Sequence, residues 1–405
     1  MEYWAEIVGQ PEAVGALQRA AEPDAVVAHA WLITGPPGSG RSNLAFRFAA
    51  ALIARHAEER AHVFEQVRAR THPDLGVLTT QKLLIDIRAA REIVTTAHYA
   101  PAEGRYRVIV IEDADRMPER TSNVLLKALE EPPERTIWIL CAPSEADLLP
   151  TIRSRTRSLR LATPSPEDIA RLLHERDGID PDAAERAARL AQSHIGMARR
   201  LASDPEALAR RDRSVELALG IATLGDAMRA AAALVKVAEA DAAALTEERD
   251  AREREDALRS LGLAPGAAIP PQMRAQIRAL EEDQKRRATR SLRDGIDRIL
   301  TDLLSVTRDI LLLALTTRAA ADAAERAPGG AAAAGGAAAS TEPGFEVINR
   351  EQLPRIADRA ERWGPERALA VVSAVETARE RLGRGITPGL VLEALFARII
   401  AVEEG

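Results

Sequence analysis

A glycine-rich loop between an apolar strand and a helix constrains this chain more than any other feature. Residues 31–34 are a short apolar run, and the loop that follows reads G-P-P-G-S-G before a helical pattern begins. Glycines reach backbone conformations closed to other residues, and loop N–H groups beside a helix N-terminus form an anion cradle. The spacing matches the G-x-x-x-x-G-K-[S/T] phosphate loop, with an arginine in place of the lysine. The candidate nucleotide-binding residues are Gly35, Gly38, Gly40, Arg41 and Ser42.

A second segment supplies the other half of an α/β domain. The β-branched run at 108–111 is continuous, which is typical of a parallel strand buried on both faces, and it ends at Glu112 and Asp113. A helical segment at 122–131 follows and is stopped by two prolines, because the residue before a proline is pushed out of the helical region. A second buried strand is predicted at 136–141. We therefore expect a parallel sheet with helices.

Two substitutions limit the chemistry of this site. Phosphate-loop ATPases use a lysine on the phosphates, an acidic magnesium ligand and an acidic residue that orients water. Arg41 keeps the charge but presents a wider, planar fork, so it either holds phosphate or merely occupies an empty cradle. In the Glu112–Asp113 pair, an aspartate in the base position is shorter than glutamate, and displacements of ~1 Å can cost ~100-fold. The site is predicted to have the shape for nucleotide without the machinery for hydrolysis.

Composition and local pattern exclude several classes of protein. The net charge of −6 argues against a strong nucleic-acid binder, although it leaves room for a basic patch. The single cysteine, Cys141, permits no internal disulfide and is predicted to be a small buried hydrophobe. The longest apolar stretch, at 310–315, is too short to cross a bilayer, and the N-terminus lacks a signal-peptide pattern. We expect a cytoplasmic protein without membrane contact.

The polar segment 55–72 is the one stretch with several metal-ligating side chains. It contains His56, His62 and His72 but no cysteine. His56 and His62 are six residues apart, so they do not share a helix face. Solvated surface is favoured over a zinc site, and no zinc is expected.

The rest of the chain has a helical texture. We predict an α/β domain at 1–161, a small lid-like domain of three helices at 162–210, and an all-helical domain at 211–405. The last contains a charged insertion at 239–290 and a flexible, low-complexity loop at 327–344.

A seam of apolar residues inside the last domain marks its packing surface. Between Leu292 and Leu313 the apolar residues recur at alternating four- and three-residue spacing. We predict the core of a bundle within the chain, with a coiled coil to another chain as the alternative.

These motifs together resemble the AAA+ clamp-loader subunits of bacterial DNA polymerase III. They cover about the first 160 residues, and the combination is far more specific than any one of them. The matching elements are V-G-Q at 8–10, the phosphate loop, T-H-P-D at 71–74, L-L-K-A-L-E-E-P-P at 125–133, S-R-T at 154–156, and G-x-x-R at 196–199 in the lid.

The resemblance implies an AAA+ phosphate-loop domain, a lid and a helical collar domain in a hetero-oligomeric ring. Its expected partners are gamma/tau and delta subunits and, through them, the sliding clamp and primed DNA. The ring serves DNA replication within the polymerase III holoenzyme, a nucleotidyltransferase complex. The departures at Arg41 and Glu112–Asp113 fit the family's stator, the member that does not hydrolyse ATP, although the loop could still bind it. This chain is expected to be neither an active ATPase nor a polymerase.

The resemblance also assigns roles to residues outside the loop. Ser154 and Arg155 match the family's S-R-C motif, whose arginine reaches the ATP of the neighbouring motor as a trans-acting finger, and Thr156 replaces the cysteine. Arg199 matches the lid arginine and lies on a helix that could lean over the nucleotide. Many relatives bind zinc through four cysteines after the phosphate-loop helix, and this chain has none there.

Two other functions compete with the stator. The first is an ATP-hydrolysing motor subunit of the same loader, which the identities at Arg41 and Asp113 disfavour. The second is a phosphate-loop kinase for small molecules, which would leave the E-E-P-P turn, the S-R motif and the helical C-terminal part unexplained.

Overall fold

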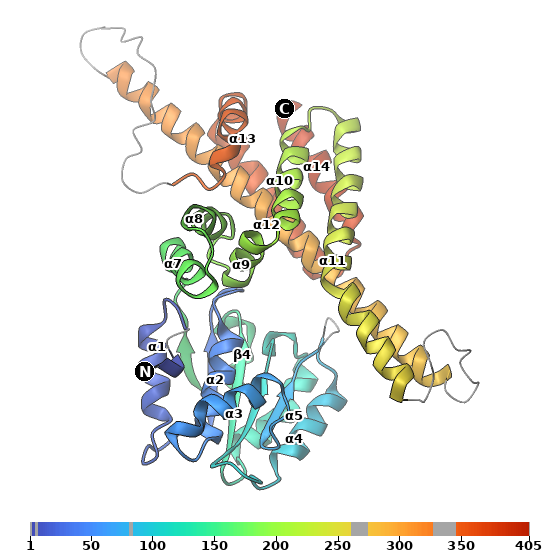
Figure 1. The fold of residues 1–405 in the computed structure, drawn as a ribbon. Coiled ribbons are helices and arrows are strands. Elements are labelled where there is room, and N and C mark those ends of the chain that lie inside the picture. The colour runs from blue at the N-terminus through green and yellow to red at the C-terminus, as the bar shows by residue number, and fades with distance from the viewer. Residues whose placement is uncertain (1, 5–6, 81–83, 261–273, 327–345, 405) are drawn as a thin grey trace. The chain divides into compact units, whose positions relative to one another are not determined.

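The computed structural model describes residues 2–4, 7–80, 84–260, 274–326 and 346–404. The chain divides into two compact units, Met1–Asp204 and Pro205–Gly405 (Figure 1). The first unit contains both the sheet and the three helices expected in a lid. The boundary predicted between residues 210 and 211 lies inside α10 (Pro205–Leu219).

The first unit is built on a five-stranded sheet in the order β2-β3-β4-β1-β5, and its strand pairs are parallel. The buried runs predicted at 31–34, 108–111 and 136–141 are its three central strands, so these predictions are confirmed. Leu32 pairs with Leu140 on one side and with Ser158 on the other. The strands are β1 (Ala30–Thr34), β2 (Leu75–Leu78), β3 (Arg107–Ile111), β4 (Thr136–Ala142) and β5 (Arg157–Arg160).

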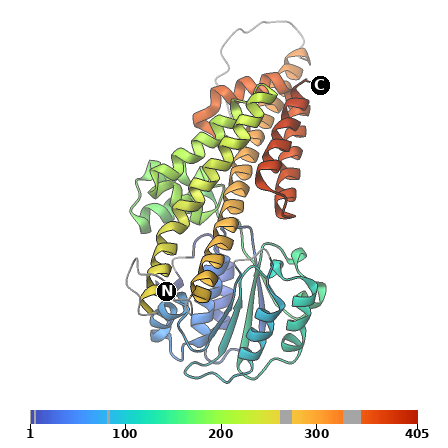
Figure 2. The ribbon, with the colours of Figure 1, turned by 90° about the vertical axis from the view of Figure 1, so that its right-hand side faces the viewer.

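Helices cover both faces of this sheet (Figures 1 and 2). Successive strand residues point to opposite faces, so Trp31 joins one apolar core and Leu32 the other. The first core is covered by α1 (Pro11–Ala20), α2 (Arg41–Ile53) and α3 (Arg60–Arg68). The second is covered by α4 (Ile87–Ala97), α5 (Glu119–Glu130) and α6 (Pro150–Arg153). Short 3-10 turns lie at Glu2–Trp4, Ala57–Glu59, Ala114–Arg116 and Glu145–Asp147.

The segment 55–72 is more buried than the sequence suggested. α3 places Val63, Phe64 and Val67 in the first core. His62 is exposed, but His72 is buried, and this burial lowers the pKa of its imidazole. The prediction of a wholly solvated segment was therefore wrong at this histidine. Within the described ranges, no three or more His, Cys, Asp or Glu side chains are grouped to hold a metal ion.

The T-H-P-D motif links the start of β2 to the loop before β3. The buried carboxylate of Asp74 accepts hydrogen bonds from the backbone N–H groups of Ala102, Glu103 and Gly104 at 2.5, 2.8 and 2.6 Å. Arg107 lies 3.3 Å away. Burial opposes ionisation, but these donors and Arg107 outweigh it and lower the pKa of Asp74. The motif therefore has a structural role.

Three helices follow β5, as predicted. They are α7 (Pro166–Asp177), α8 (Pro181–Leu190) and α9 (Ile195–Ser203). Ser165, Asp180 and His194 cap their N-termini with side-chain acceptors, which satisfies donors that a helix start leaves unpaired.

The second unit is a helical bundle, and in its described part no strand is found. Residues of the predicted seam, among them Ile296, Ile299, Leu303 and Val306, are buried in one core shared by its helices. The prediction of an intrachain bundle is confirmed. The unit comprises α10, α11 (Leu224–Ser260), α12 (Arg274–Arg326), α13 (Leu353–Gly383), α14 (Pro388–Glu404) and a 3-10 turn at Arg350–Gln352.

A buried polar network crosses this bundle. Arg211 donates to Asp302 at 3.1 Å and to the side-chain oxygen of Asn349 at 2.7 Å. Asn349 in turn donates its backbone and side-chain N–H groups to Asp309 at 2.8 and 2.9 Å. Burial raises the pKa of Asp302 to about 6, against the opposing effect of Arg211. The network links α10, α12 and the segment before α13.

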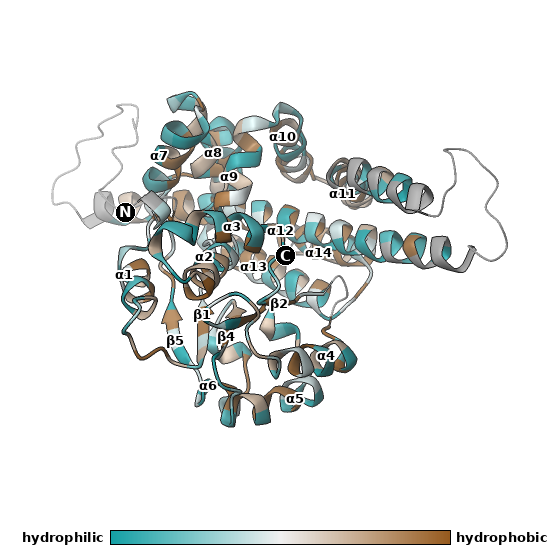
Figure 3. Cartoon of the chain, turned by 60° about the horizontal axis from the view of Figure 1, so that its bottom comes forward, coloured by the Kyte–Doolittle hydropathy of each residue, from teal (hydrophilic) through white to brown (hydrophobic). Residues whose placement is uncertain are grey.

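The charged insertion is a pair of helix segments joined by ion pairs. Arg287 of α12 lies 2.6 Å from Glu253 and 3.5 Å from Asp250 of α11, and Arg254 lies 2.9 Å from Glu281. Figure 3 shows hydrophilic residues predominating along this part of α12. Residues 261–273 of the insertion and the low-complexity loop 327–344 lie outside the described residues. Among the helices described, none combines the length and apolar character needed to cross a membrane.

Candidate functional site

The phosphate loop lies where the sequence placed it, between β1 and α2. Gly38 and Gly40 have φ values of +80° and +90°, in the left-handed region that side chains disfavour. Gly35 is buried against Leu161, and a Cβ there would approach the Leu161 Cβ to 2.9 Å. Ser42, in the first turn of α2, is half-buried. The backbone therefore has the cradle conformation that the motif predicts.

Arg41 is bound to its own loop. Its Nη1 donates a hydrogen bond to the carbonyl oxygen of Gly35 at 2.7 Å. The guanidinium thus satisfies a loop carbonyl in this structure. Of the two roles open from the sequence, this contact favours an arginine that fills the cradle.

The N-terminus of α9 packs directly on the loop. The N–H of Ile195 donates to the carbonyl of Gly38 at 3.2 Å. The ring of His194 lies so close to Gly38 that a Cβ there would be 2.5 Å from its Nδ1 and Cδ2 atoms. The same Nδ1 accepts the N–H of Met197 at 3.1 Å, so capping the helix fixes the ring over the loop. The loop tip is covered by the chain's own side chain.

Arg199 lies on the lid helix α9, and its guanidinium is bound within the lid. α9 leans on the loop through His194 and Ile195, whereas the Nε of Arg199 donates to Asp177 at 2.8 Å. Asp177 is the last residue of α7, so this ion pair joins two lid helices. In this structure Arg199 stabilises the lid.

The acidic pair at the end of β3 has arginine partners. Glu112 lies 2.8 Å from Arg70, and Asp113, at φ +53°, lies 3.7 Å from Arg116. Burial raises the pKa of the nearby Asp115, and the charge of Asp113 adds to the shift. Each carboxylate that a phosphate-loop enzyme would use for magnesium and water therefore has an arginine within 4 Å.

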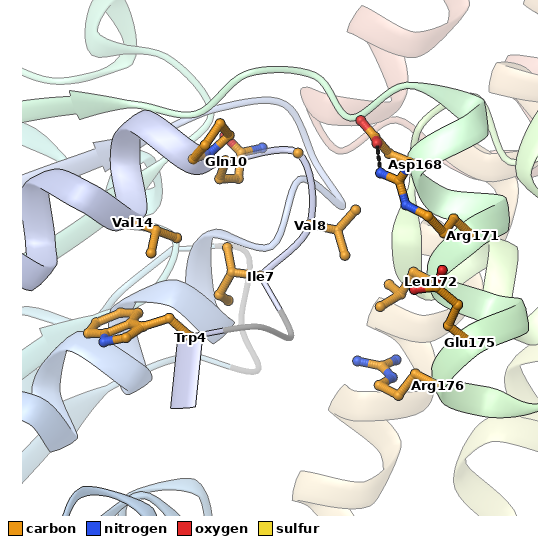
Figure 4. Close-up of a pocket in the computed structure, with 12 residues that line it drawn as sticks. Trp4, Ile7, Val8, Gln10, Val14, Asp168, Arg171, Leu172, Glu175 and Arg176 are labelled. Atoms are coloured by element: carbon orange, nitrogen blue, oxygen red, sulfur yellow. Dashed lines mark hydrogen bonds and ion pairs between the residues drawn. The ribbon is translucent and has the colours of Figure 1, made fainter. Parts of the chain in front are cut away.

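A cavity of about 530 Å³ opens between the N-terminal segment and α7 (Figure 4). This volume is within the range of small-ligand pockets. Gln10 fixes one wall, because its side-chain amide donates to the carbonyl of Ala162 at 2.7 Å and accepts the Ala162 N–H at 2.8 Å. Figure 4 shows Ile7, Val8 and Val14 facing the α7 side chains Arg171 and Leu172.

The S-R-T motif lies on the surface just after α6. Arg155 donates through Nη1 to the carbonyl of Thr151 at 2.7 Å and to the hydroxyl of Ser154 at 3.1 Å. Its Nη2 lies 2.5 Å from a carboxylate oxygen of Glu130, and 32% of its side chain is exposed. From the sequence, no carboxylate partner was predicted for this arginine. Glu130, in a distant segment, is that partner.

The structure therefore brings some of the predicted site residues together and leaves others apart. The loop residues and the Glu112–Asp113 pair follow the carboxyl ends of β1 and β3, which is the same edge of the parallel sheet. His194 and Glu130 were not among the predicted site residues. A local signal was near both, since His194 lies just before G-x-x-R and Glu130 is the first residue of E-E-P-P.

Comparison with known proteins points to one family. Residues 9–165 match the family model described as DNA polymerase III, delta subunit. The chain is 34% identical over 152 residues to DNA polymerase III subunit delta' of Pseudomonas aeruginosa, a match covering 36% of this chain and 46% of that protein. It is 30% identical over 190 residues to subunit gamma/tau of Mycobacterium tuberculosis, covering 45% and 33%. The chain thus spans less than half the length of these curated relatives.

Among solved structures, a gamma subunit-related protein of Thermotoga maritima aligns with a TM-score of 0.43 at 14% identity, over 97% of this chain and 99% of that one.

The strand order, the phosphate loop after β1 and the helical lid define an AAA+ phosphate-loop unit. By its family-model match and its delta' and gamma/tau relatives, this N-terminal unit belongs to the clamp-loader family of DNA polymerase III subunits.

Proposed function

We propose that this chain is the delta-prime-type stator of a clamp loader. It assembles with gamma/tau-type and delta-type subunits into a ring that loads the sliding clamp onto primed DNA, and it hydrolyses no ATP itself. One observation carries the proposal. Gly38 of the phosphate loop is covered by His194 of the chain's own lid, while Arg155 is kept at the surface.

Three features of the loop site oppose hydrolysis. Arg41 replaces lysine and binds Gly35, the Glu112 and Asp113 carboxylates each lie beside an arginine, and His194 covers Gly38. A nucleotide that needs the space beside Gly38 would have to displace the N-terminus of α9. A stator needs no such movement, since a lid fastened to the loop by protein contacts is rigid without nucleotide.

The role of Arg155 is to act in trans. Its guanidinium would neutralise charge that develops on the γ-phosphate bound by the neighbouring motor subunit. Such a finger can be worth ~10³-fold or more in rate. Ser154 supports this role by accepting a hydrogen bond from the same guanidinium.

An ATP-hydrolysing motor subunit is the alternative. It is favoured by the gamma/tau relative, which matches over a longer segment than the delta' relative does. The residues of the loop site favour the stator.

Nucleotide binding by the purified full chain discriminates between the two functions. Fluorescently labelled ATP with Mg²⁺ should show no saturable binding, and turnover should not exceed that of buffer. The His194→Gly variant tests whether the His194 ring prevents this binding, since removing the ring from Gly38 should give the chain measurable affinity for ATP. Saturable binding by the unmodified chain, with turnover that Asp113→Asn abolishes, would establish the motor.

A further inference from the structure

The arginine of the S-R-T motif is turned back toward its own subunit by a single carboxylate. Glu130 is the last residue of α5, and its Oε1 lies 2.5 Å from Nη2 of Arg155, beyond the end of α6. The side chains are 47% and 32% exposed, so the pair is accessible to a neighbouring molecule.

Packing beneath the pair fixes the positions from which both side chains start. α5 must end near Glu130, because two prolines follow it at residues 132 and 133. Leu125 and Leu129 of α5 and Ile152 of α6 are buried in the same apolar core. The backbones of the two helices are therefore held together independently of the surface pair.

Both terminal nitrogens of Arg155 are engaged within the subunit. Nη1 donates to Thr151 and Ser154, and Nη2 binds Glu130. The carboxylate also cancels the charge of the guanidinium. A finger aimed at a γ-phosphate needs that charge and at least one of these donors.

We propose that Glu130 holds Arg155 in an inactive position within its own subunit, until the triphosphate of a neighbouring subunit competes for the guanidinium. The proposal rests on the trans-acting role of Arg155 and describes the regulation of that site. A triphosphate carries more negative charge than one carboxylate, so it displaces Glu130 only when the ring brings it close. The Glu130–Arg155 ion pair should therefore suppress ATP hydrolysis in rings that do not bring a triphosphate close to Arg155.

Neutralising the carboxylate is the test. In the reconstituted loader, ATP hydrolysis is measured without and with the clamp and primed DNA. Glu130→Gln keeps the shape and removes the charge, so hydrolysis without clamp and DNA should rise roughly 1.5- to 5-fold, the range expected from exposed ion pairs. The stimulated rate should change little, because there the phosphate already holds the arginine.

Glu131→Gln is the matched control. Glu131 is the next residue, is exposed, and makes no ion pair among the residues that the structure describes. It loses the same charge and should leave both rates unchanged. An equal rise in this variant would show a general field effect and overturn the proposal.

The trans-acting role of Arg155 and its restraint by Glu130 are tested by different outcomes. If Arg155→Ala leaves hydrolysis unchanged, the trans-acting role itself is wrong. If Arg155→Ala lowers hydrolysis but Glu130→Gln leaves the unstimulated rate unchanged or lowers it, only the proposal that Glu130 holds Arg155 inactive is wrong. In the Arg155→Ala background, Glu130→Gln should have no effect, because the arginine it releases is absent.

Discussion

Replacing Gly38 with alanine should destabilise the first unit by about 2–5 kcal/mol. The left-handed backbone at φ +80° contributes about 1–2 kcal/mol of this cost. The new Cβ would also lie 2.5 Å from two atoms of the His194 ring, and such overpacking costs about 1–3 kcal/mol. Because His194 is held by its cap to Met197, the ring cannot simply swing aside.

Gly178→Ala is the matched control for this prediction. Gly178 has φ +68° in the same unit, but open space surrounds its Cβ position, so only the backbone term applies. Unfolding in urea can be followed by tryptophan fluorescence in a Trp363→Phe background, since the other three of the four tryptophans lie in the first unit.

A double-mutant cycle isolates the contact between the ring and the loop. His194→Ala alone loses a helix cap, worth about 0.5–2 kcal/mol. In that background Gly38→Ala should cost only the backbone term, giving a coupling of about 1–3 kcal/mol. If Gly38→Ala costs no more than Gly178→Ala, or the coupling is near zero, His194 does not cover the loop in solution.

Three further predictions concern the buried charges and the paired helices. Because burial raises the pKa of Asp302 from 3.8 to about 6, folding takes up a proton there between those pH values, and stability falls as pH rises across that window, by at most about 3 kcal/mol. Asp302→Asn should remove this slope from the free energy of unfolding, and an unchanged slope would contradict it. The pKa of Asp74 is lowered, so its ionised carboxylate stabilises the fold above about pH 4, and this stabilisation is lost as pH falls further. Asp74→Asn should therefore lower the free energy of unfolding by about 3–5 kcal/mol at pH 7 and by less in acid. An unchanged free energy of unfolding at pH 7 would refute the structural role of Asp74. Arg287→Ala should speed amide exchange near Glu253 and leave exchange near Val306 unchanged, whereas equal protection near Glu253 would show that the ion pairs do not hold α11 to α12.

The sheet could be predicted because its signal is local. A strand buried on both faces needs an unbroken apolar run, and 108–111 has one. The loop was recognisable for the same reason, since the left-handed backbone at Gly38 calls for glycine at a fixed spacing.

The contacts that decide what the site does join distant segments, and no local pattern encodes them. His194 reaches Gly38 only because the lid folds back over the loop, and Glu130 reaches Arg155 only because α5 packs beside α6. His72 was placed in solvent because its neighbours in sequence are polar, whereas the fold buries its ring, which accepts the N–H of Asp74. Arg199 was matched to a motif, but its ion pair with Asp177, 22 residues away in sequence, has no local signal.

ATP hydrolysis by the reconstituted loader carrying Arg155→Ala tests the stator account most directly. Arg153→Ala is the control, because this exposed arginine ends α6, two residues before Arg155. The ring should assemble with either variant. The account predicts that Arg155→Ala lowers the hydrolysis stimulated by clamp and primed DNA, through the loss of one motor site, and that Arg153→Ala leaves it near the unmodified rate. An unchanged stimulated rate with Arg155→Ala would contradict the account.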